Sequence, residues 1–199
     1  MSETDDRAGG GVVLSRIYTR TGDDGTTALG DMSRTRKTDP RIGAYADVDE
    51  ANAAIGVAIA LGSLPPEVAE LLTSIQNDLF DVGADLCTPV VPDPEWPPLR
   101  VTSVYVDRLE AACDLYNARL TKLRSFVLPG GTSGAALLHV ARTVTRRAER
   151  STWAQQEADP ATTNPLAATY LNRLSDLLFI LARVANPAGD VLWKPGANR

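Results

Sequence analysis

The sequence predicts an all-α fold, a five-helix bundle that follows a short, irregular N-terminal loop. Two observations carry this prediction. Apolar residues recur at intervals of three and four along five segments, and capping or helix-breaking residues bound each segment. A bundle is the simplest architecture that buries five such stripes. The length of 199 residues suits one domain, and a hydrophobic content of 44% is enough for a sizeable core.

The first two helices begin at prolines. Asp39-Pro40 places an N-cap before a proline at the first helical position, and this helix runs to about Leu61 and stops at Gly62. The second helix begins near Pro66 and ends before Thr88-Pro89. Its apolar stripe is the best in the chain and consists of Val68, Leu71, Leu72, Ile75, Leu79, Val82 and Leu86.

Three further helices follow a loop at residues 89–98, where five prolines exclude a helix or an inner strand. The third helix is predicted from about Ser103 to Leu120, and the fourth from just after Gly130-Gly131 to about Gln156. We interpret Cys113 as a core residue. The buried face of the third helix consists of Leu109, Ala112, Cys113 and Tyr116.

The fifth helix begins at Asn164-Pro165 and stops at Asn186-Pro187. Its buried stripe consists of Leu171, Leu174, Leu177, Leu178, Leu181 and Val184. On the fourth helix, we expect a buried side made of Leu137, Val140, Val144 and Ala148. We interpret His139, on the same helix, as a structural histidine.

Charge and cysteine usage restrict the class of protein. A net charge of −5 argues against nucleic acid as the main partner, two cysteines make no disulfide framework, and one histidine gives no zinc set. No signal peptide is recognised, and no run approaches the roughly 18 apolar residues of a membrane span. We therefore expect a cytoplasmic protein without a membrane partner. Its parts are a disordered tail at 1–14, one domain at 15–186 and a C-terminal tail at 187–199.

The string TRTGDDGTT at residues 19–27 suits phosphate binding. Gly22 and Gly25 let backbone N–H groups turn toward one point, and four threonines add hydroxyls. The string lacks the ending of a Walker A motif, and a simple polar turn is the alternative. A basic segment, Arg34-Thr35-Arg36-Lys37, follows closely and is either a second phosphate-binding element or a solvated loop.

The fourth helix gathers charge on one face. Four arginines within nine residues offer a dense set of phosphate-binding groups, although a solvated outer face of the bundle is the alternative. The residues that share this face at intervals of four, three and four are Arg142, Arg146, Glu149 and Trp153, with Arg147 and Arg150 on its flanks.

Two other polar sets lie on helical faces. Asn172 and Asp176 are four residues apart on the leucine-rich fifth helix, which indicates either polar neighbours or an exposed face. On the first helix, an aligned acid, amide and glycine suit a close helix contact, and the acid, Asp49, can pair with an arginine of the fourth helix. The aligned residues are Tyr45, Asp49, Asn52 and Gly56.

Five strings together resemble the PduO-type ATP:cob(I)alamin adenosyltransferases. They are IYTRTGDDGTT, the lysine Lys37, AYADVDEANAAIG, FVLPGGTSGAALLHVARTVTRRAER and NRLSDLLFILAR. They occur in the family's order and cover most of the chain between residues 16 and 185. The departures include Asp24, where the family often has lysine, and Arg20, which replaces a lysine.

The resemblance implies a five-helix bundle and a homotrimer that binds ATP between subunits. It implies that the loop residues Thr19, Arg20, Thr21, Gly22, Gly25 and Thr27 bind the nucleotide, with Lys37 on the phosphates. It implies that the partner subunit completes the ATP site with Arg146, Arg147, Glu149, Arg150 and Asn172. Asp49 and Arg142 would tie the first helix to the fourth across the interface. Phe126 would fill the space below the corrin.

The implied reaction moves the 5′-deoxyadenosyl group of ATP to the cobalt of cob(I)alamin and releases triphosphate. ATP, Mg²⁺ and cobalamin are the expected cofactors and substrates, and no metal-ligating residues are assigned. A cobalamin reductase and an adenosylcobalamin-dependent acceptor enzyme are the expected protein partners. The alternatives are a non-catalytic adenosylcobalamin carrier or ATP-responsive binding protein on the same bundle, and a purely structural bundle.

Overall fold

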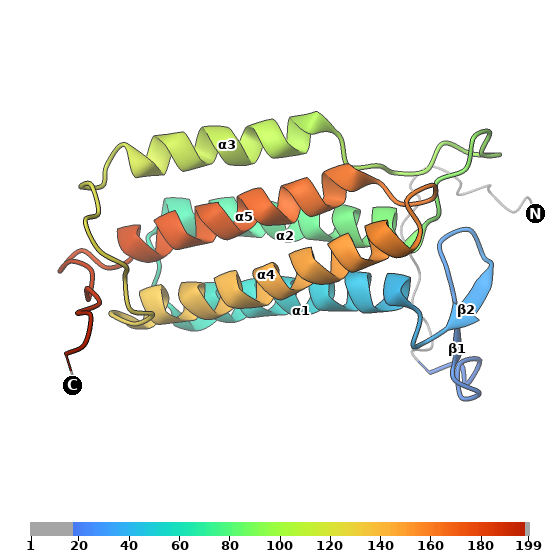
Figure 1. Ribbon diagram of the computed structural model, residues 1–199, viewed down its shortest axis with the longest axis horizontal. Coiled ribbons are helices and arrows are strands. Elements are labelled where there is room, and N and C mark those ends of the chain that lie inside the picture. The colour runs from blue at the N-terminus through green and yellow to red at the C-terminus, as the bar shows by residue number, and fades with distance from the viewer. Residues whose placement is uncertain (1–17, 198–199) are drawn as a thin grey trace, which may run out of the picture.

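The computed structural model describes residues 18–197, so the disordered tail predicted at 1–14 lies outside the described residues. Five α-helices form an elongated bundle, and a two-stranded antiparallel hairpin lies at one end of it (Figure 1). The elements in order are β1 (Thr26–Ala28), β2 (Arg34–Arg36), α1 (Pro40–Leu61), α2 (Pro66–Cys87), α3 (Ser103–Asn117), α4 (Ser133–Ala158) and α5 (Pro165–Val184). The predicted all-α bundle is confirmed, and the hairpin is an addition to it.

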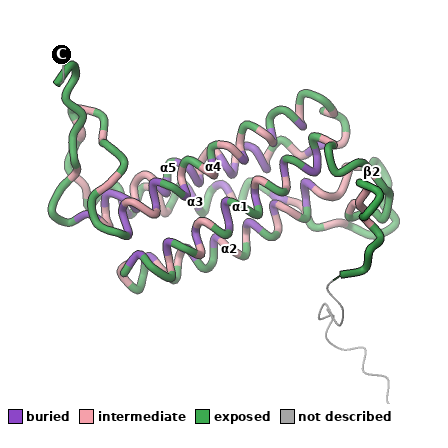
Figure 2. The backbone as a smooth tube through the Cα atoms, turned by 90° about the horizontal axis from the view of Figure 1, so that it is seen from below, coloured by how far each residue is buried: buried purple, intermediate pink, exposed green. Residues whose placement is uncertain are grey.

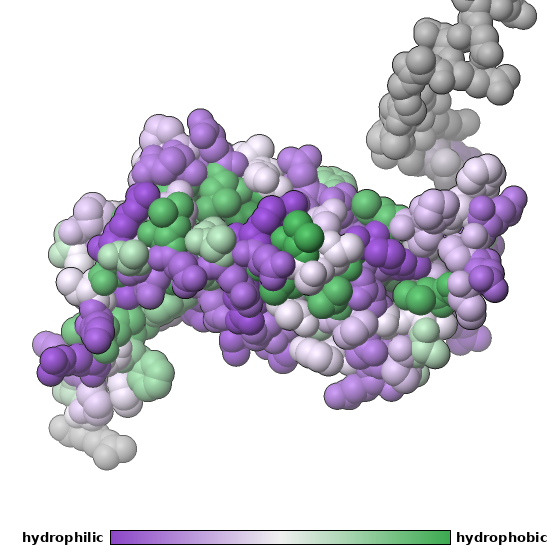
Figure 3. Space-filling model, turned by 90° about the horizontal axis from the view of Figure 1, so that it is seen from above, coloured by the Kyte–Doolittle hydropathy of each residue, from purple (hydrophilic) through white to green (hydrophobic). Residues whose placement is uncertain are grey.

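The helices pack in a fixed order. α1 lies against α2 and α4, and α5 lies against α4 and α3. Each helix turns a buried stripe toward its neighbours and an exposed stripe outward (Figure 2). On the face that carries α3, hydrophobic patches are small and hydrophilic residues separate them (Figure 3). Along residues 18–197, no helix combines the length and the apolar character that crossing a membrane requires.

The helix boundaries agree with the predicted ones except at two ends. α3 ends at Asn117, three residues before the predicted Leu120, because tight turns replace the helical pattern there: Leu120 N donates to Asn117 O at 3.0 Å. α4 continues two residues beyond Gln156, to Ala158. Asp39 caps α1 and Asn164 caps α5, and each accepts a backbone N–H two residues on.

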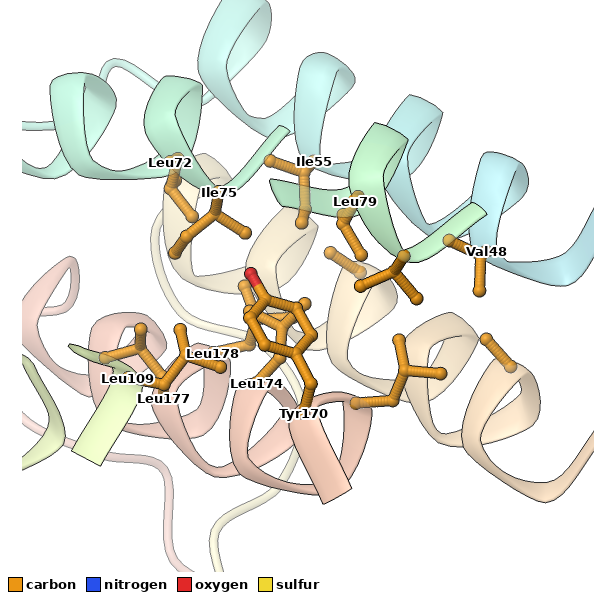
Figure 4. Close-up of a cluster of buried hydrophobic side chains, with 14 of the residues drawn as sticks. Val48, Ile55, Leu72, Ile75, Leu79, Leu109, Tyr170, Leu174, Leu177 and Leu178 are labelled. Atoms are coloured by element: carbon orange, nitrogen blue, oxygen red, sulfur yellow. The ribbon is translucent and has the colours of Figure 1, made fainter. Parts of the chain in front are cut away.

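The core lies between α1, α2, α4 and α5, and α3 closes it from outside (Figure 4). The predicted stripes of α2 and α5 are confirmed, since Leu72, Leu79 and five leucines of α5 are fully buried. Tyr170 is the largest of the fully buried side chains. Its hydroxyl donates to Asp78 Oδ2 on α2 at 3.2 Å. Cys113 packs against this core, and burial raises the pKa of its thiol to about 11, as suits a packing residue.

The predicted buried side of α4 is wrong in part. Ala148 is buried as expected, but Val140 is 54% exposed and Leu137 and Val144 are only half-buried. Apart from Leu138, the buried face is instead made of small and polar residues that let α4 approach α1 and α5 closely: Ala135, Ala141, Thr145, Ala148 and Thr152. The two threonines satisfy their hydroxyls on the carbonyl oxygens four residues earlier, at 2.9 Å. The hydrophobicity of the side chains alone predicts the wrong buried face, because the close approach of α1 and α5 favours small side chains on the face that is buried.

A buried carboxylate organises the end of the bundle that carries the hairpin. The Asp85 side chain, at the end of α2, is fully buried. Its Oδ1 lies 2.6 Å from Arg100 Nη1, and its Oδ2 accepts from Val101 N at 2.7 Å and from Asn164 Nδ2 at 2.6 Å. One side chain therefore joins α2, the end of the proline-rich loop and the first turn of α5.

Arg41 makes the complementary connection. It is buried at the start of α1. Its Nη1 donates to Leu86 O at 2.9 Å, and its Nη2 donates to Thr162 Oγ1 at 2.6 Å and lies 3.4 Å from Asp159 Oδ2. The start of α1 is thus fixed to the end of α2 and to the connection between α4 and α5.

We expect Asp85→Asn to lower the free energy of unfolding by about 3 kcal/mol, because removing one member of a buried pair leaves the other charge without compensation. The measurement is urea unfolding followed by circular dichroism. The matched control is Glu110→Gln, which removes the half-exposed partner of Arg173 and should cost less than about 1 kcal/mol. Equal losses in the two variants would show that Asp85 does not organise this end.

Candidate functional site

The N-terminal loop is a closed hairpin. β1 and β2 pair with Thr27 opposite Thr35, and Lys37 N continues the ladder by donating to Gly25 O at 2.9 Å. Gly25 N donates to Gly22 O at 3.2 Å and has φ +82°, a conformation that favours glycine. Gly22 lies against Lys37, whose Nζ would be 3.1 Å from a Cβ at that position. The structure therefore brings the predicted lysine to the predicted loop.

Asp24 has a structural part in this loop. Its Oδ1 accepts from Thr26 N at 2.9 Å and from Thr26 Oγ1 at 2.8 Å, and Arg34 lies 3.9 Å away. These hydrogen bonds, together with the charge of Arg34, lower the pKa of Asp24. Arg34 also donates to Thr21 O at 2.7 Å. The aspartate that replaces the family's frequent lysine thus holds the turn in place.

The hairpin is anchored to the bundle at its tip. Gly30 N donates to Cys87 O at 2.9 Å, and Gly30 approaches Thr88 so closely that a Cβ would lie 2.0 Å from Thr88 Oγ1. Thr35 Oγ1 donates to Asp39 Oδ2 at 2.7 Å, which ties β2 to the cap of α1. The loop therefore has a fixed position relative to α1 and α2.

The arginines of α4 divide into two groups. Arg142 and Arg146 line a 220 Å³ cavity between α4 and α5, together with Ser175, Asp176, Phe179 and Ile180. Burial first, and then the positive charge of Arg146, lower the pKa of Arg142. Arg146 and Arg150 are exposed, and neither forms an ion pair within residues 18–197. Adjacent cations without a carboxylate partner favour an anionic ligand.

Arg147 belongs to the other group. It forms ion pairs with Asp47, at 3.3 Å, and with Glu50, both on α1. These carboxylates raise the pKa of Arg147, Glu50 contributing most. The expectation that Arg147 binds the nucleotide does not fit this arrangement, because its guanidinium already joins α4 to α1.

Glu149 and Asn172 meet across the α4–α5 contact. Asn172 Nδ2 donates to Glu149 Oε1 at 3.0 Å. Asp176, one turn further along α5, lies 3.2 Å from Arg173 Nη1. The two polar positions of α5 thus face polar neighbours on α4 and on their own helix.

Asp49 and Arg142 do not meet within one chain. Asp49 lines a 350 Å³ cavity between α1 and α2 with Tyr45, Asn52 and Phe80, whereas Arg142 lies between α4 and α5. The predicted alignment on α1 is confirmed in part: Asn52 Nδ2 donates to Gln76 O at 3.0 Å. A Cβ at Gly56 would lie 3.2 Å from Gln76 Nε2, so the glycine permits this close contact.

Phe126 lies at the opposite end of the bundle from the hairpin. It is 76% exposed and packs against Trp193, with ring centroids 5.9 Å apart. Segments 126–128 and 191–193 pair antiparallel through Leu128 N to Val191 O and Trp193 N to Phe126 O, each at 2.8 Å. The segment predicted as a separate C-terminal tail is therefore hydrogen-bonded to the loop that carries Phe126 (Figure 1).

The sequence did not predict the contacts that hold Phe126 and Trp193 in place. Arg183, at the end of α5, is buried; its Nε lies 2.8 Å from Asp190 Oδ2 and its Nη2 donates to Thr121 O at 2.8 Å. The two loops that carry the aromatic residues are thus bound to one arginine. The feature of the sequence that could have indicated this role is an arginine inside a leucine-rich stripe.

The length of α4 separates these parts within one chain. Arg41 contacts Asp159, so the hairpin lies at the C-terminal end of α4, roughly 25 Å along the helix axis from Arg142. Thr132, whose hydroxyl donates to Ala185 O at 2.6 Å, marks the other end, beside the Phe126 loop. A cavity of 530 Å³ lies between the hairpin tip and the proline-rich loop, and none of the predicted site residues lines it.

His139 is buried, as expected of a structural histidine, with 3% of its surface exposed. It contacts Phe179 edge-on, with ring centroids 6.1 Å apart. Burial, and then the charge of Arg142, lower its pKa from the ordinary value of 6.5, while Asp190 acts weakly in the opposite direction. The neutral form is therefore the one that the fold accommodates.

Comparison with known proteins agrees with these features. The family model for cobalamin adenosyltransferase matches residues 17–185. A corrinoid adenosyltransferase of Mycobacterium tuberculosis (strain H37Rv) is 66% identical over 188 residues, covering 94% of this chain and 97% of that protein. One of Bacillus subtilis (strain 168) is 42% identical over 189 residues, with 92% and 94% covered.

A solved structure extends the comparison to the fold. It is a phenylalanine-to-alanine variant of a PduO-type ATP:corrinoid adenosyltransferase from Lactobacillus reuteri, complexed with cobalamin and ATP. It superposes with a TM-score of 0.80 at 38% sequence identity and covers 90% of this chain and 99% of that one.

The chain therefore belongs to the cobalamin adenosyltransferase family, of which these matches represent the PduO type. Its activity is the ATP-dependent transfer of an adenosyl group to cobalamin, and the predicted family, reaction class and substrates are confirmed.

We expect stability to fall with decreasing pH through His139. The unfolded state takes up a proton near pH 6.5, whereas the native state, with the lower pKa, takes it up only at a lower pH. The free energy of unfolding should therefore decrease as pH falls below about 6.5. In His139→Gln this component should be absent, which urea unfolding at pH 7.5, 6.5 and 5.5 measures. Parallel pH profiles for the two proteins would contradict the prediction.

Proposed function

We propose that the adenosyl transfer takes place between two copies of the chain in a homotrimer. The hairpin and Lys37 of one copy would meet Arg146, Glu149, Arg150 and Asn172 of the next around the triphosphate. Arg146 is roughly 20 Å along α4 from the end that lies beside the hairpin, and this separation within one chain supports the arrangement. Asp49 and Arg142, which lie in different grooves of one chain, would pair across the same interface.

The observation that carries the assignment is the contrast among the arginines of α4. Arg147 is neutralised by two carboxylates of α1, whereas Arg146 and Arg150 have no ion-pair partner within residues 18–197. A triphosphate supplies the missing negative charge, and guanidinium groups bind its oxygens through paired hydrogen bonds.

In the proposed reaction, the electron pair of Co(I) forms a bond to C5′ of ATP. The bond from C5′ to the triphosphate oxygen breaks, and its electrons leave with triphosphate. Arg146, Arg150, Lys37 and the loop N–H groups would stabilise this growing charge. Holding C5′ against the cobalt supplies the other contribution, since orientation can lower a barrier by roughly 7–11 kcal/mol. The hard chemistry belongs to the cobalt, so no nucleophilic side chain is required.

Mg²⁺ is expected to come with the nucleotide. The cavity that holds Arg142 and Arg146 offers one carboxylate, Asp176. Mg²⁺ commonly binds through one or two carboxylates together with phosphate oxygens and water, so this donor set fits it. Asp176 and the triphosphate would hold the ion, and the ion would supply further neutralisation of the leaving group.

Phe126 is the proposed apolar wedge below the corrin. Excluding the lower ligand makes cob(II)alamin easier to reduce, and an exposed aromatic ring at a fixed position suits that task. Trp193 enlarges the apolar surface, because its ring packs on Phe126. The proposal also places the protein in the cytoplasm. A reductase would supply its electrons, and an acceptor enzyme would take up its product.

Arg146→Ala should reduce the rate of adenosylcobalamin formation from ATP and chemically reduced cob(I)alamin by roughly a hundredfold or more. Its neighbour Arg147 provides the contrast. Arg147→Ala should keep most of the activity and lower the melting temperature, because it breaks the contact with α1. The assay is the change in the visible spectrum of the corrinoid. Equal activity losses in both variants would contradict the division of the arginines.

Phe126→Ala should retain ATP binding and the rate from pre-reduced cob(I)alamin but lose most of the rate from cob(II)alamin supplied with a reductant. The reason is that the wedge acts on the reduction of cobalt and not on the displacement. Parallel assays from the two oxidation states, with ATP affinity by calorimetry, make the measurement. An unchanged rate from cob(II)alamin would contradict the proposed role of Phe126 as a wedge.

A further inference from the structure

The two loops beside Phe126 carry an excess of positive charge. Residues 118–132 contain Arg119, Lys122 and Arg124 and no acidic residue, and residues 187–197 contain Lys194 and one acid, Asp190. Asp190 is neutralised by Arg183. These four cations contrast with the net charge of −5 of the whole chain. The aromatic end of the bundle therefore attracts an anion.

Three of these cations have no protein partner. Arg119 lies over the ring of Tyr116, 4.9 Å from its centroid. Lys122, Arg124 and Lys194 are exposed, and along residues 18–197 none of their side chains forms an ion pair or a hydrogen bond. Seven other arginines of this part of the chain have a carboxylate within ion-pair distance: Arg34, Arg41, Arg100, Arg108, Arg147, Arg173 and Arg183.

The pairing of the two loops fixes where Arg124 and Lys194 lie along the chain, and Lys122 lies two residues before Arg124. Val127 is opposite Leu192, so Phe126 is opposite Trp193 and Ser125 is opposite Lys194. Ser125 Oγ donates to Trp193 O at 2.8 Å, which extends the connection to that point. Arg124 and Lys194 thus border the aromatic pair on both loops. They belong to the same rigid unit as the proposed wedge.

We propose that Lys122, Arg124 and Lys194 bind the phosphodiester of the corrinoid's nucleotide loop when the lower base is displaced. This inference rests on the proposed place of Phe126 below the corrin. The phosphodiester links the lower base to the ring, so displacing the base from cobalt moves this anion to the side of the wedge. The triphosphate of ATP is the less suitable ligand, because Arg146 lies about 20 Å further along α4 than Thr132.

The consequence is a preference for corrinoids that carry the phosphate. Exposed ion pairs are individually weak, so each cation should contribute little and the three together more. Binding of such corrinoids should weaken with rising salt, since exposed charges are screened. A corrinoid without the phosphate should bind with no salt dependence from this source.

The test uses the full chain with ATP present and three ligands: cob(II)alamin, cob(II)inamide, which lacks phosphate and base, and cob(II)inamide phosphate, which restores the phosphate alone. Replacing Lys122, Arg124 and Lys194 together by glutamine should raise the dissociation constants of cob(II)alamin and cob(II)inamide phosphate about tenfold. The constant for cob(II)inamide should not change. Arg119→Gln, at the same end of the bundle, is the matched control and should leave all three constants unchanged.

Equal weakening of all three ligands, or no weakening of any, would overturn the phosphate site. Weakening of cob(II)alamin alone would also overturn it, because the base would then be the recognised group. Failure of the underlying function gives a different result, in which the wild-type protein with ATP binds none of the three. Unchanged melting temperatures and unchanged turnover of cobinamide by the triple variant exclude loss of the fold.

Discussion

The length of one rigid helix, α4, determines the layout of the molecule. Its C-terminal end is fixed near the hairpin through Arg41 and Asp159, and its N-terminal end is fixed beside the aromatic loops through Thr132 and Ala185. The arginines stand between these ends. A straight helix keeps such groups apart within one chain, which is why the proposed site is shared between copies. The close packing of α4 on α1 and α5 makes the separation a fixed property of the fold.

Charge pairing then decides which cations are available to substrates. Arg146 and Arg147 are adjacent in sequence, but successive helical positions differ in direction by about 100°. Arg147 therefore reaches the carboxylates of α1, while Arg146 faces the groove toward α5. The same division recurs at the aromatic end, where Arg183 is neutralised by Asp190 and Arg124 is not. In both places, a buried or paired arginine stabilises the fold, and an exposed arginine without a partner is available to bind an anion.

Much of this was open to prediction from the sequence, because prolines and caps define the helix starts and leucines define the stripes of α2 and α5. The buried face of α4 was not, since Val140 is more apolar than Thr145 and only the closeness of α1 and α5 favours the smaller side chain. The turn-rich loop at residues 19–27 was predicted, but the hairpin that follows it was not, because strands of three residues leave no periodic signal. Arg147 differs from Arg146 because a neighbouring helix, α1, supplies its carboxylate partners, and the sequence alone does not show that α1 lies there.

The exposed aromatic pair is the feature of this frame that most requires a ligand. Large apolar rings in water cost free energy, and a monomer that holds two of them together at its surface marks a contact site. Here the rings are also held by two loops, a buried ion pair and a strand-like pairing, so they do not collapse onto the bundle. In the proposed function, the flat, apolar and polar-rimmed corrin would cover this surface. The rigidity of the support would let an apolar contact compete with a metal ligand, because the cost of ordering the wedge is met when the chain folds and not when the corrinoid binds.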